Sequence, residues 1–198
     1  MRRLAGFGAI VVAVDADERG LLELARGHPD RIEPLALDPR CSARWADIAA
    51  AWGTEPLHVF LDMTLLAPEA ATRMGRALAD LDALTGALRA GLRRGQATGV
   101  IALPVPDRGA ARAQVALAAA ARAILPELAT RSRPARLAGV EIGTGGPWDA
   151  DRLTALGDAV LMLCHPVSRA VVAGTVVSCE AGTIGARAAL DEATAETS

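Results

Sequence analysis

Six short apolar segments recur along the chain, each followed by a helical segment or a turn. The first and third, at residues 9–15 and 58–64, are nearly continuous runs rich in Val, Leu and Phe. Such runs are typical of strands that are covered on both faces, as in parallel sheets. The pattern predicts six strands, at residues 9–15, 32–38, 58–64, 99–105, 136–143 and 174–179.

The segments between the strands predict five helices. Pro68 and Asp107 stand where helices begin, and Gly53 and Gly95 stand where helices end. Strands that alternate with helices through short connections indicate an α/β fold, a three-layer Rossmann-like sandwich around a mostly parallel six-stranded sheet. We expect one domain over residues 1–185 and a C-terminal tail over residues 186–198. The predicted helices cover residues 17–27, 43–52, 68–94, 109–130 and 150–164.

The composition fits a compact protein with one core. Of the 198 residues, 52% are hydrophobic and 22% are charged, which is ample for a single buried core. The 23 acidic and 21 basic residues leave a net charge of −2. No surface that tracks phosphates or anionic lipid is therefore indicated, and nucleic acid is not an expected partner.

The chain shows no targeting or membrane segment. Arg2 and Arg3 precede an apolar stretch, as in secretion signals, but this stretch ends at Asp15 without a small-residue cleavage site. No segment reaches the ~18–20 apolar residues that a membrane span needs. We expect a cytoplasmic protein without a membrane partner.

The cysteines and histidines indicate no metal site. Three cysteines at wide spacing favour reduced thiols over a disulfide framework. Cys164 and His165 are adjacent, so on a helix their side chains diverge by about 100°, which suits neither a nucleophile-base pair nor a shared metal. His28 and His58 have no ligand spacing to a cysteine, so no zinc site is expected.

The order of the segments resembles the short-chain dehydrogenase/reductase family over almost the whole chain. The first predicted strand, with its final Asp15, is similar to the family's second strand, whose terminal acid usually holds the adenine ribose of NAD. The second predicted strand ends at Asp38, which corresponds to the family's Asp beside the adenine. The clearest likeness is a last helix and a final strand with an acidic-glycine ending. The segments that carry the resemblance are residues 8–19, 35–38, 58–64, 156–164 and 173–182.

This alignment leaves the family's first strand and its glycine-rich turn without a counterpart. In a dinucleotide site that turn brings backbone N–H groups and a helix N-terminus to the pyrophosphate. Asp15 and Asp38 are therefore interpreted as vestigial cofactor-binding residues. We expect no bound cofactor; the alternative is that NAD(P) binds. We expect the sheet to close over the gap in the strand order 2-1-3-4-5-6, because an open slot leaves two strand edges unpaired. A start codon upstream of Met1 would restore the turn.

The resemblance also identifies the missing catalytic groups. The family's reaction uses a Tyr, a Lys, an Asn and a Ser, whereas this chain has no Tyr, no Lys and no Asn. The positions of the Tyr and the Lys fall at Ala110 and Gln114. The Asn turn reads Asp-Met-Thr-Leu over residues 62–65, and the strand end of the Ser, residues 103–106, has no hydroxyl. We expect no catalytic residues and a non-catalytic, oxidoreductase-like protein, with residual NAD(P)-dependent oxidoreductase activity as the alternative.

An alanine-rich helix over residues 110–125 has small side chains on nearly every face. Another backbone can approach such a helix from more than one side, although the high helix propensity of alanine explains the composition equally well. In the resembled family, the helices that correspond to residues 68–94 and 109–130 form the helix bundle of the dimer. We therefore expect a homo-oligomer, or a hetero-oligomer with an intact relative, through these two helices.

Asp15 and Asp62 support a second interpretation. In the expected strand order they flank the crevice at the carboxyl ends of the first and third strands. Residues 14–18 and 61–68 look like the acidic pocket and phosphoacceptor Asp of a response-regulator receiver domain, in which carboxylates hold Mg²⁺, but the Lys of a receiver is absent. The alternative function is a small-ligand or metal-binding module. The simpler interpretation is that Asp15, Asp17 and Asp62 cap helices or face water.

Overall fold

The computed structural model describes residues 1–38, 41–53, 55–144, 149–165, 173–180 and 183–187. The chain divides into two compact units, Met1–Arg44 and Trp45–Ser198, and the predicted single domain spans both of them. Among the described residues, no helix combines the length with the apolar character that a membrane span requires.

The first unit is a two-stranded parallel sheet with two helices. Strands β1 and β2 pair so that Asp15 lies opposite Ala36. Helix α2 begins where the Asp17 carboxylate accepts a hydrogen bond from the Gly20 N–H at 3.1 Å, a typical N-cap. The apolar core of this unit consists of Ala5, Ala13, Leu21 and Ile32. The elements are α1 (Arg2–Gly6), β1 (Val11–Asp15), α2 (Glu18–Arg26) and β2 (Ile32–Ala36).

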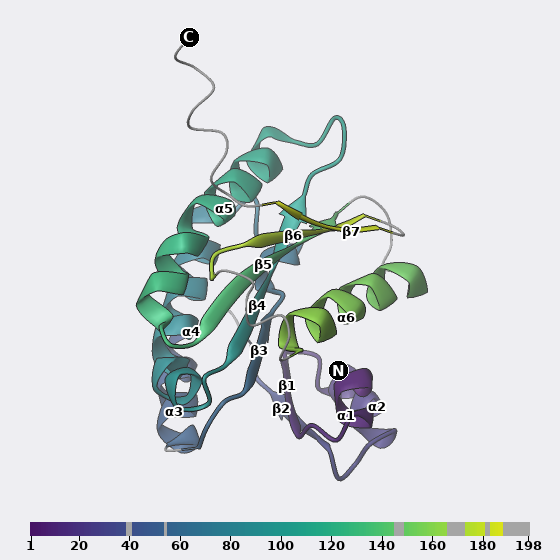
Figure 1. Ribbon diagram of the computed structural model, residues 1–198, viewed down its shortest axis with the longest axis vertical. Coiled ribbons are helices and arrows are strands. Elements are labelled where there is room, and N and C mark those ends of the chain that lie inside the picture. The colour runs from purple at the N-terminus through teal and green to yellow at the C-terminus, as the bar shows by residue number, and fades with distance from the viewer. Residues whose placement is uncertain (39–40, 54, 145–148, 166–172, 181–182, 188–198) are drawn as a thin grey trace. The chain divides into compact units, whose positions relative to one another are not determined.

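The second unit is built on a five-stranded sheet with the order β3-β4-β5-β6-β7. Strands β3 to β6 are parallel, and β7 returns antiparallel beside β6. Helices α4 and α5 cover one face of the sheet, and α6 covers the other (Figure 1). The strands are β3 (Val59–Asp62), β4 (Thr98–Val105), β5 (Arg136–Gly143), β6 (Val176–Glu180) and β7 (Thr183–Arg187). The helices are α3 (Ser42–Trp52), the 3₁₀ turn η1 (Thr64–Leu66), α4 (Met74–Arg94), α5 (Arg112–Ser132) and α6 (Ala150–Cys164).

Strand β4 shows how the sheet is buried on both faces. Ile101 belongs to the apolar cluster that includes Leu125 of α5, whereas the adjacent Val100 belongs to the cluster that includes Val160 of α6. All four side chains are almost completely buried, and each such burial contributes about 1.5–3 kcal/mol to the free energy of unfolding. The requirement for apolar side chains on both faces explains why this strand reads as an uninterrupted apolar run.

Helix α5 lies unusually close to the sheet at Gly139 of β5. A Cβ atom at this position would come within 2.6 Å of Leu103 Cδ1 and within 3.0 Å of Leu125 Cδ2. A side chain here would therefore force the ends of Leu103 and Leu125 to shift within the packed core.

The predicted fold class is confirmed, and all six predicted strands are present. Strand β1 pairs with β2, and β3, β4, β5 and β6 pair in that order, all in parallel as expected. Strands β1 and β2 form a two-stranded sheet and β3 to β7 a five-stranded sheet. The expected closure of β1 against β3 joins the two units and stays a prediction. Apolar periodicity identifies the strands, but it does not say which strand edges pair.

Strand β7 was not expected from the apolar pattern. We placed a tail from residue 186 onward, whereas Ala186 and Arg187 pair with Val177 and Val176 of β6. The strand has a single large apolar residue, Ile184, so it lacks the alternation by which a strand is recognised. The remainder of the expected tail, residues 188–198, lies outside the described residues.

Helix α4 begins at Met74, six residues after the Pro68 that we expected to start it. The intervening chain forms turns, in which the Ala70 N–H bonds to the Ala67 carbonyl and the Arg73 N–H bonds to the Glu69 carbonyl. Ala70 packs into the core between the sheet and the helices. This burial holds the segment in turns, although proline is a good residue for the first position of a helix.

Gly95, which ends α4, provides a stability test. A Cβ at this position would overlap the main-chain carbonyl of Leu57, and backbone cannot move aside as a side-chain end can. We expect Gly95→Ala to lower the free energy of unfolding by about 1–3 kcal/mol, the usual cost of overpacking. Gly86→Ala in the same helix is the matched control, because its Cβ makes only ordinary contact, and it should gain up to about 1 kcal/mol in helix propensity. Urea unfolding of both variants measures the difference, and equal stabilities would contradict this packing.

Candidate functional site

Asp62 is the polar side chain that the fold buries at the carboxyl end of a strand. It is the last residue of β3, lies opposite Ile101 of β4, and is only 3% exposed. Its Oδ1 accepts hydrogen bonds from the Thr64 N–H at 2.8 Å and from the Thr64 hydroxyl at 2.6 Å. Both bonds are local and hold the start of η1 against the strand end.

The other carboxyl oxygen, Asp62 Oδ2, is buried and has no hydrogen-bond partner among the described residues. Burial raises the pKa of Asp62 above its usual value, and the bonds from the Thr64 hydroxyl and main chain lower it by less. Because desolvation penalises the charged form, the site favours a protonated, neutral carboxyl group.

The end of strand β4 supplies no reactive group. Its last three residues, Leu103 to Val105, carry neither hydroxyl nor ionisable side chain. The Val105 carbonyl is already engaged, because it accepts bonds from the Thr144 N–H at 3.0 Å and from the Thr144 hydroxyl at 3.2 Å. This strand end therefore binds its own backbone neighbours.

The start of α5 is equally inert. Ala110 precedes the helix, and the Gln114 Oε1 accepts a hydrogen bond from the Ala111 N–H at 3.2 Å. The two positions that the family resemblance assigns to Tyr and Lys thus hold a methyl group and an amide that caps its own helix.

Asp15 is the last residue of β1, and Asp38 comes two residues after the end of β2. Because the two strands are parallel, both residues lie at the same edge of the first unit. Asp15 is exposed, and its Oδ1 accepts a hydrogen bond from the Asp17 N–H at 3.0 Å. The interpretation of Asp15 and Asp17 as turn and cap residues is confirmed. A cofactor-binding role for Asp15 and Asp38 stays a prediction.

The predicted crevice between Asp15 and Asp62 also stays a prediction, because these residues belong to different units. The described part of the chain brings no three His, Cys, Asp or Glu side chains together in a group that could hold a metal ion. The metal-binding variant of the hypothesis therefore gains no support from the structure.

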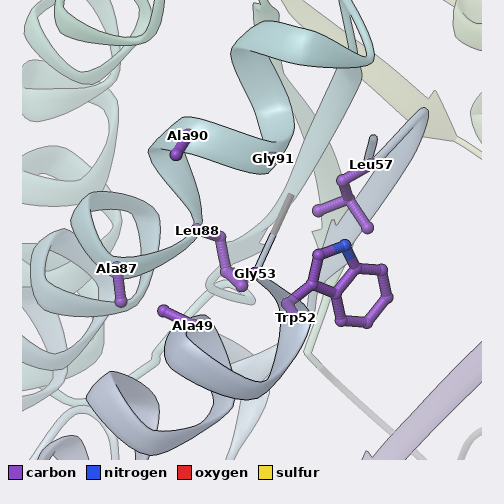
Figure 2. Close-up of a pocket in the computed structure, with 8 residues that line it drawn as sticks. All are labelled: Ala49, Trp52, Gly53, Leu57, Ala87, Leu88, Ala90 and Gly91. Atoms are coloured by element: carbon purple, nitrogen blue, oxygen red, sulfur yellow. The ribbon is translucent and has the colours of Figure 1, made fainter. Parts of the chain in front are cut away.

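A small pocket between α3 and α4 is lined by groups without acid-base chemistry. It has a volume of about 20 Å³, close to the room for one water, which needs roughly 10–15 Å³. Figure 2 shows Trp52 of α3 beside Leu57, with Ala87 and Gly91 of α4 on the other side. The pocket is too small and too apolar to serve as an active site.

Cys164 and His165 have structural roles, as predicted. Cys164 is half-buried against the core below α6, and His165 is the C-cap of that helix. Burial raises the pKa of the Cys164 thiol, while the Arg136 guanidinium lowers it by less. A thiol of this kind is a poor nucleophile.

Two polar contacts of the structure were not predicted from the sequence. Thr64 as the partner of Asp62 could have been found, because Asp followed two residues later by Thr is a common local hydrogen-bonding pattern. The ion pair between Arg122 of α5 and Glu141 of β5, at 2.6 Å, had no local signal. It joins residues 19 positions apart that meet only because the helix packs over the strand.

No protein-family model and no curated protein matches this chain. Among the solved structures that match, three have TM-scores of 0.67 to 0.69. A short-chain dehydrogenase/reductase of glucose/ribitol dehydrogenase type from Brucella melitensis has 17% identity and a TM-score of 0.69, over 90% of this chain and 87% of that chain.

Two further matches were solved with cofactors. A 3-ketoacyl-(acyl-carrier-protein) reductase from Brucella melitensis, in complex with NADH, has 17% identity and a TM-score of 0.69, over 91% of this chain and 90% of that chain. A putative short-chain dehydrogenase/reductase from Burkholderia multivorans, with bound NADP, has 16% identity and a TM-score of 0.67, over 92% and 90%. Identities this low establish the fold alone.

Asp62 makes stability depend on pH. Since its pKa is raised in the folded state, the folded protein holds this proton more tightly, and stability falls as the pH rises from about 4 through the folded pKa. Asp62→Asn keeps the acceptor for Thr64 but cannot ionise. We expect it to raise the free energy of unfolding at pH 8 by about 1–3 kcal/mol, the cost of an unsatisfied buried polar group, and to change it little at pH 4.

Chemical unfolding between pH 4 and pH 9 measures this effect. Equal pH profiles for the wild type and Asp62→Asn would rule out a buried, desolvated carboxyl at this position.

Proposed function

We propose that this chain, which has the short-chain dehydrogenase/reductase fold, is non-catalytic and acts through association with a second copy or with an intact relative. The observation that carries the proposal is the composition: no Tyr, no Lys and no Asn occurs anywhere in the 198 residues. The groups that perform proton transfer in the resembled family are therefore excluded at every position, whatever the alignment.

Carbonyl reduction needs a proton donor and a hydride source that is held in register. General acid catalysis contributes about 10²–10⁴-fold to the rate, and positioning contributes more. Here Ala110 has no proton to donate, and Gln114 caps its own helix. Asp62 is bonded to Thr64 and buried. At these described positions, the side chains bond to their own chain or carry no acid-base group, whereas a reductase would have its proton donor there.

Helices α4 and α5 support the association. They pack side by side on one face of the sheet, where Arg131 of α5 forms an ion pair with Asp82 of α4 at 3.0 Å (Figure 1). Val115 of α5 is 51% exposed. Small residues are interspersed with arginines among the exposed positions of both helices, and where the small residues gather another backbone can come close. The exposed small residues are Gly75, Ala79, Ala83 and Ala90 of α4, and Ala113, Ala116, Ala119 and Ala123 of α5.

Cofactor binding and turnover test the first half of the proposal. We expect no melting shift with NAD, NADP or Mg²⁺. A ligand that binds would be detected, because at 100 times its Kd it would add about 2.7 kcal/mol to the free energy of unfolding. We expect no NADH or NADPH oxidation with carbonyl substrates. An intact reductase of this fold is the positive control. Turnover by the purified chain would overturn the proposal, and a shift that Asp15→Ala removes would support the ligand-binding alternative.

Mass measurement in solution tests the second half. We expect the chain to be oligomeric, alone or mixed with an intact relative from the same genome. The double change Ala83→Arg and Ala119→Arg should convert it to a monomer, because two long charged side chains block close approach of another backbone. Leu153→Arg, at an exposed position of α6, is the control and should leave the assembly intact. A monomeric wild type that binds no relative would contradict the association.

A further inference from the structure

Arg89 of α4 is a cation without a counter-charge in the described part of the chain. The residue is half-buried, and its Nε is buried with no hydrogen-bond partner there. Arg89 also takes part in no ion pair among the described residues. Because burial of an unpaired charge is unfavourable, this position favours a carboxylate that comes from outside the chain.

Arg89 lies on the side of α4 that faces α5. It follows Asp82 by seven residues and precedes Arg93 by four, so the three side chains share one face of the helix. Asp82 forms an ion pair with Arg131 of α5 at 3.0 Å, and Arg93 Nη2 donates a hydrogen bond to the Arg131 carbonyl at 2.9 Å. The side chains of Asp82 and Arg131 are 46% and 40% exposed. The seam between the two helices, defined by these residues, is therefore accessible to another molecule.

Glu127 of α5 provides a carboxylate beside the same seam. Its side chain is 70% exposed, and its contact with Arg131 is long, at 3.5 Å. An exposed ion pair of this kind contributes little to stability. Arg131 keeps a shorter partner in Asp82, so Glu127 is available to a second cation.

We propose that Arg89 binds Glu127 of a second copy of this chain. A two-fold axis across α4 and α5 forms this ion pair twice, because each copy presents both the unpaired cation and the loosely held carboxylate. Charge complementarity of this kind determines which partners and which orientation fit. The inference rests on the proposed association and names the contact that orients it.

Charge reversal tests the ion pair, with the dimer Kd measured by analytical ultracentrifugation. Arg89→Glu and Glu127→Arg should each raise the Kd by at least about tenfold, because each change places like charges opposite one another at both sites. An equimolar mixture of the two variants should dimerise about as tightly as the wild type, since each mixed pair again joins opposite charges. Arg19→Glu, at a 90% exposed side chain of α2, is the control and should leave the Kd unchanged.

The outcomes separate this ion pair from the association itself. A monomeric wild type that binds no relative contradicts both. A wild type that associates only with an intact relative, variants that both keep the wild-type Kd, or a mixture that stays monomeric would overturn the ion pair alone.

A second set of variants applies if Arg89→Glu does not fold. Arg89→Gln and Glu127→Gln remove the charges without reversing them. Each should raise the Kd, and the double variant should be no weaker than either single variant, because the two side chains act through one contact. Additive effects of the two changes would overturn the ion pair.

Discussion

Burial of one sheet on both faces is the constraint on which the second unit depends. Strands β4 and β5 lie between α4 and α5 on one side and α6 on the other, so every inward position must be apolar or small. Polar chemistry is thereby confined to the strand ends, where chains leave the core. Asp62 is at such an end, but it is itself buried, and this conflict between charge and burial makes it the most informative side chain in the fold.

The strand ends of this protein bind their own chain. Gln114 caps α5, Thr144 bonds the end of β4, and Asp17 caps α2. Side chains engaged in this way satisfy backbone groups that would otherwise be unpaired, but they are not available to a substrate. The apolar core and the polar strand ends thus make separate contributions to the stability of this scaffold.

The sequence allowed the strands, the helices and their layers to be predicted, because apolar periodicity reports burial directly. It did not reveal the ion pair of Arg122 with Glu141, since this contact depends on which distant segments meet. Helix α4 begins at Met74, after turns that place Ala70 in the core, and Pro68 alone does not report this packing. At Asp62, sequence identified the residue, but its burial and its unpaired oxygen required the packing of η1.

The return of β7 beside β6 affects how the protein behaves at high concentration. An edge strand with unpaired N–H and C=O groups is a template for non-native pairing and amyloid-like growth. With β7 in place, the strand that follows β6 in the described sheet is five residues long, contains Gly185 and ends in Arg187. A short strand, a glycine and a terminal charge all disfavour the repeated addition of strands from other chains. The reversal of chain direction thus protects β6, which begins with the buried Val176 and Val177, from recruitment into aggregates.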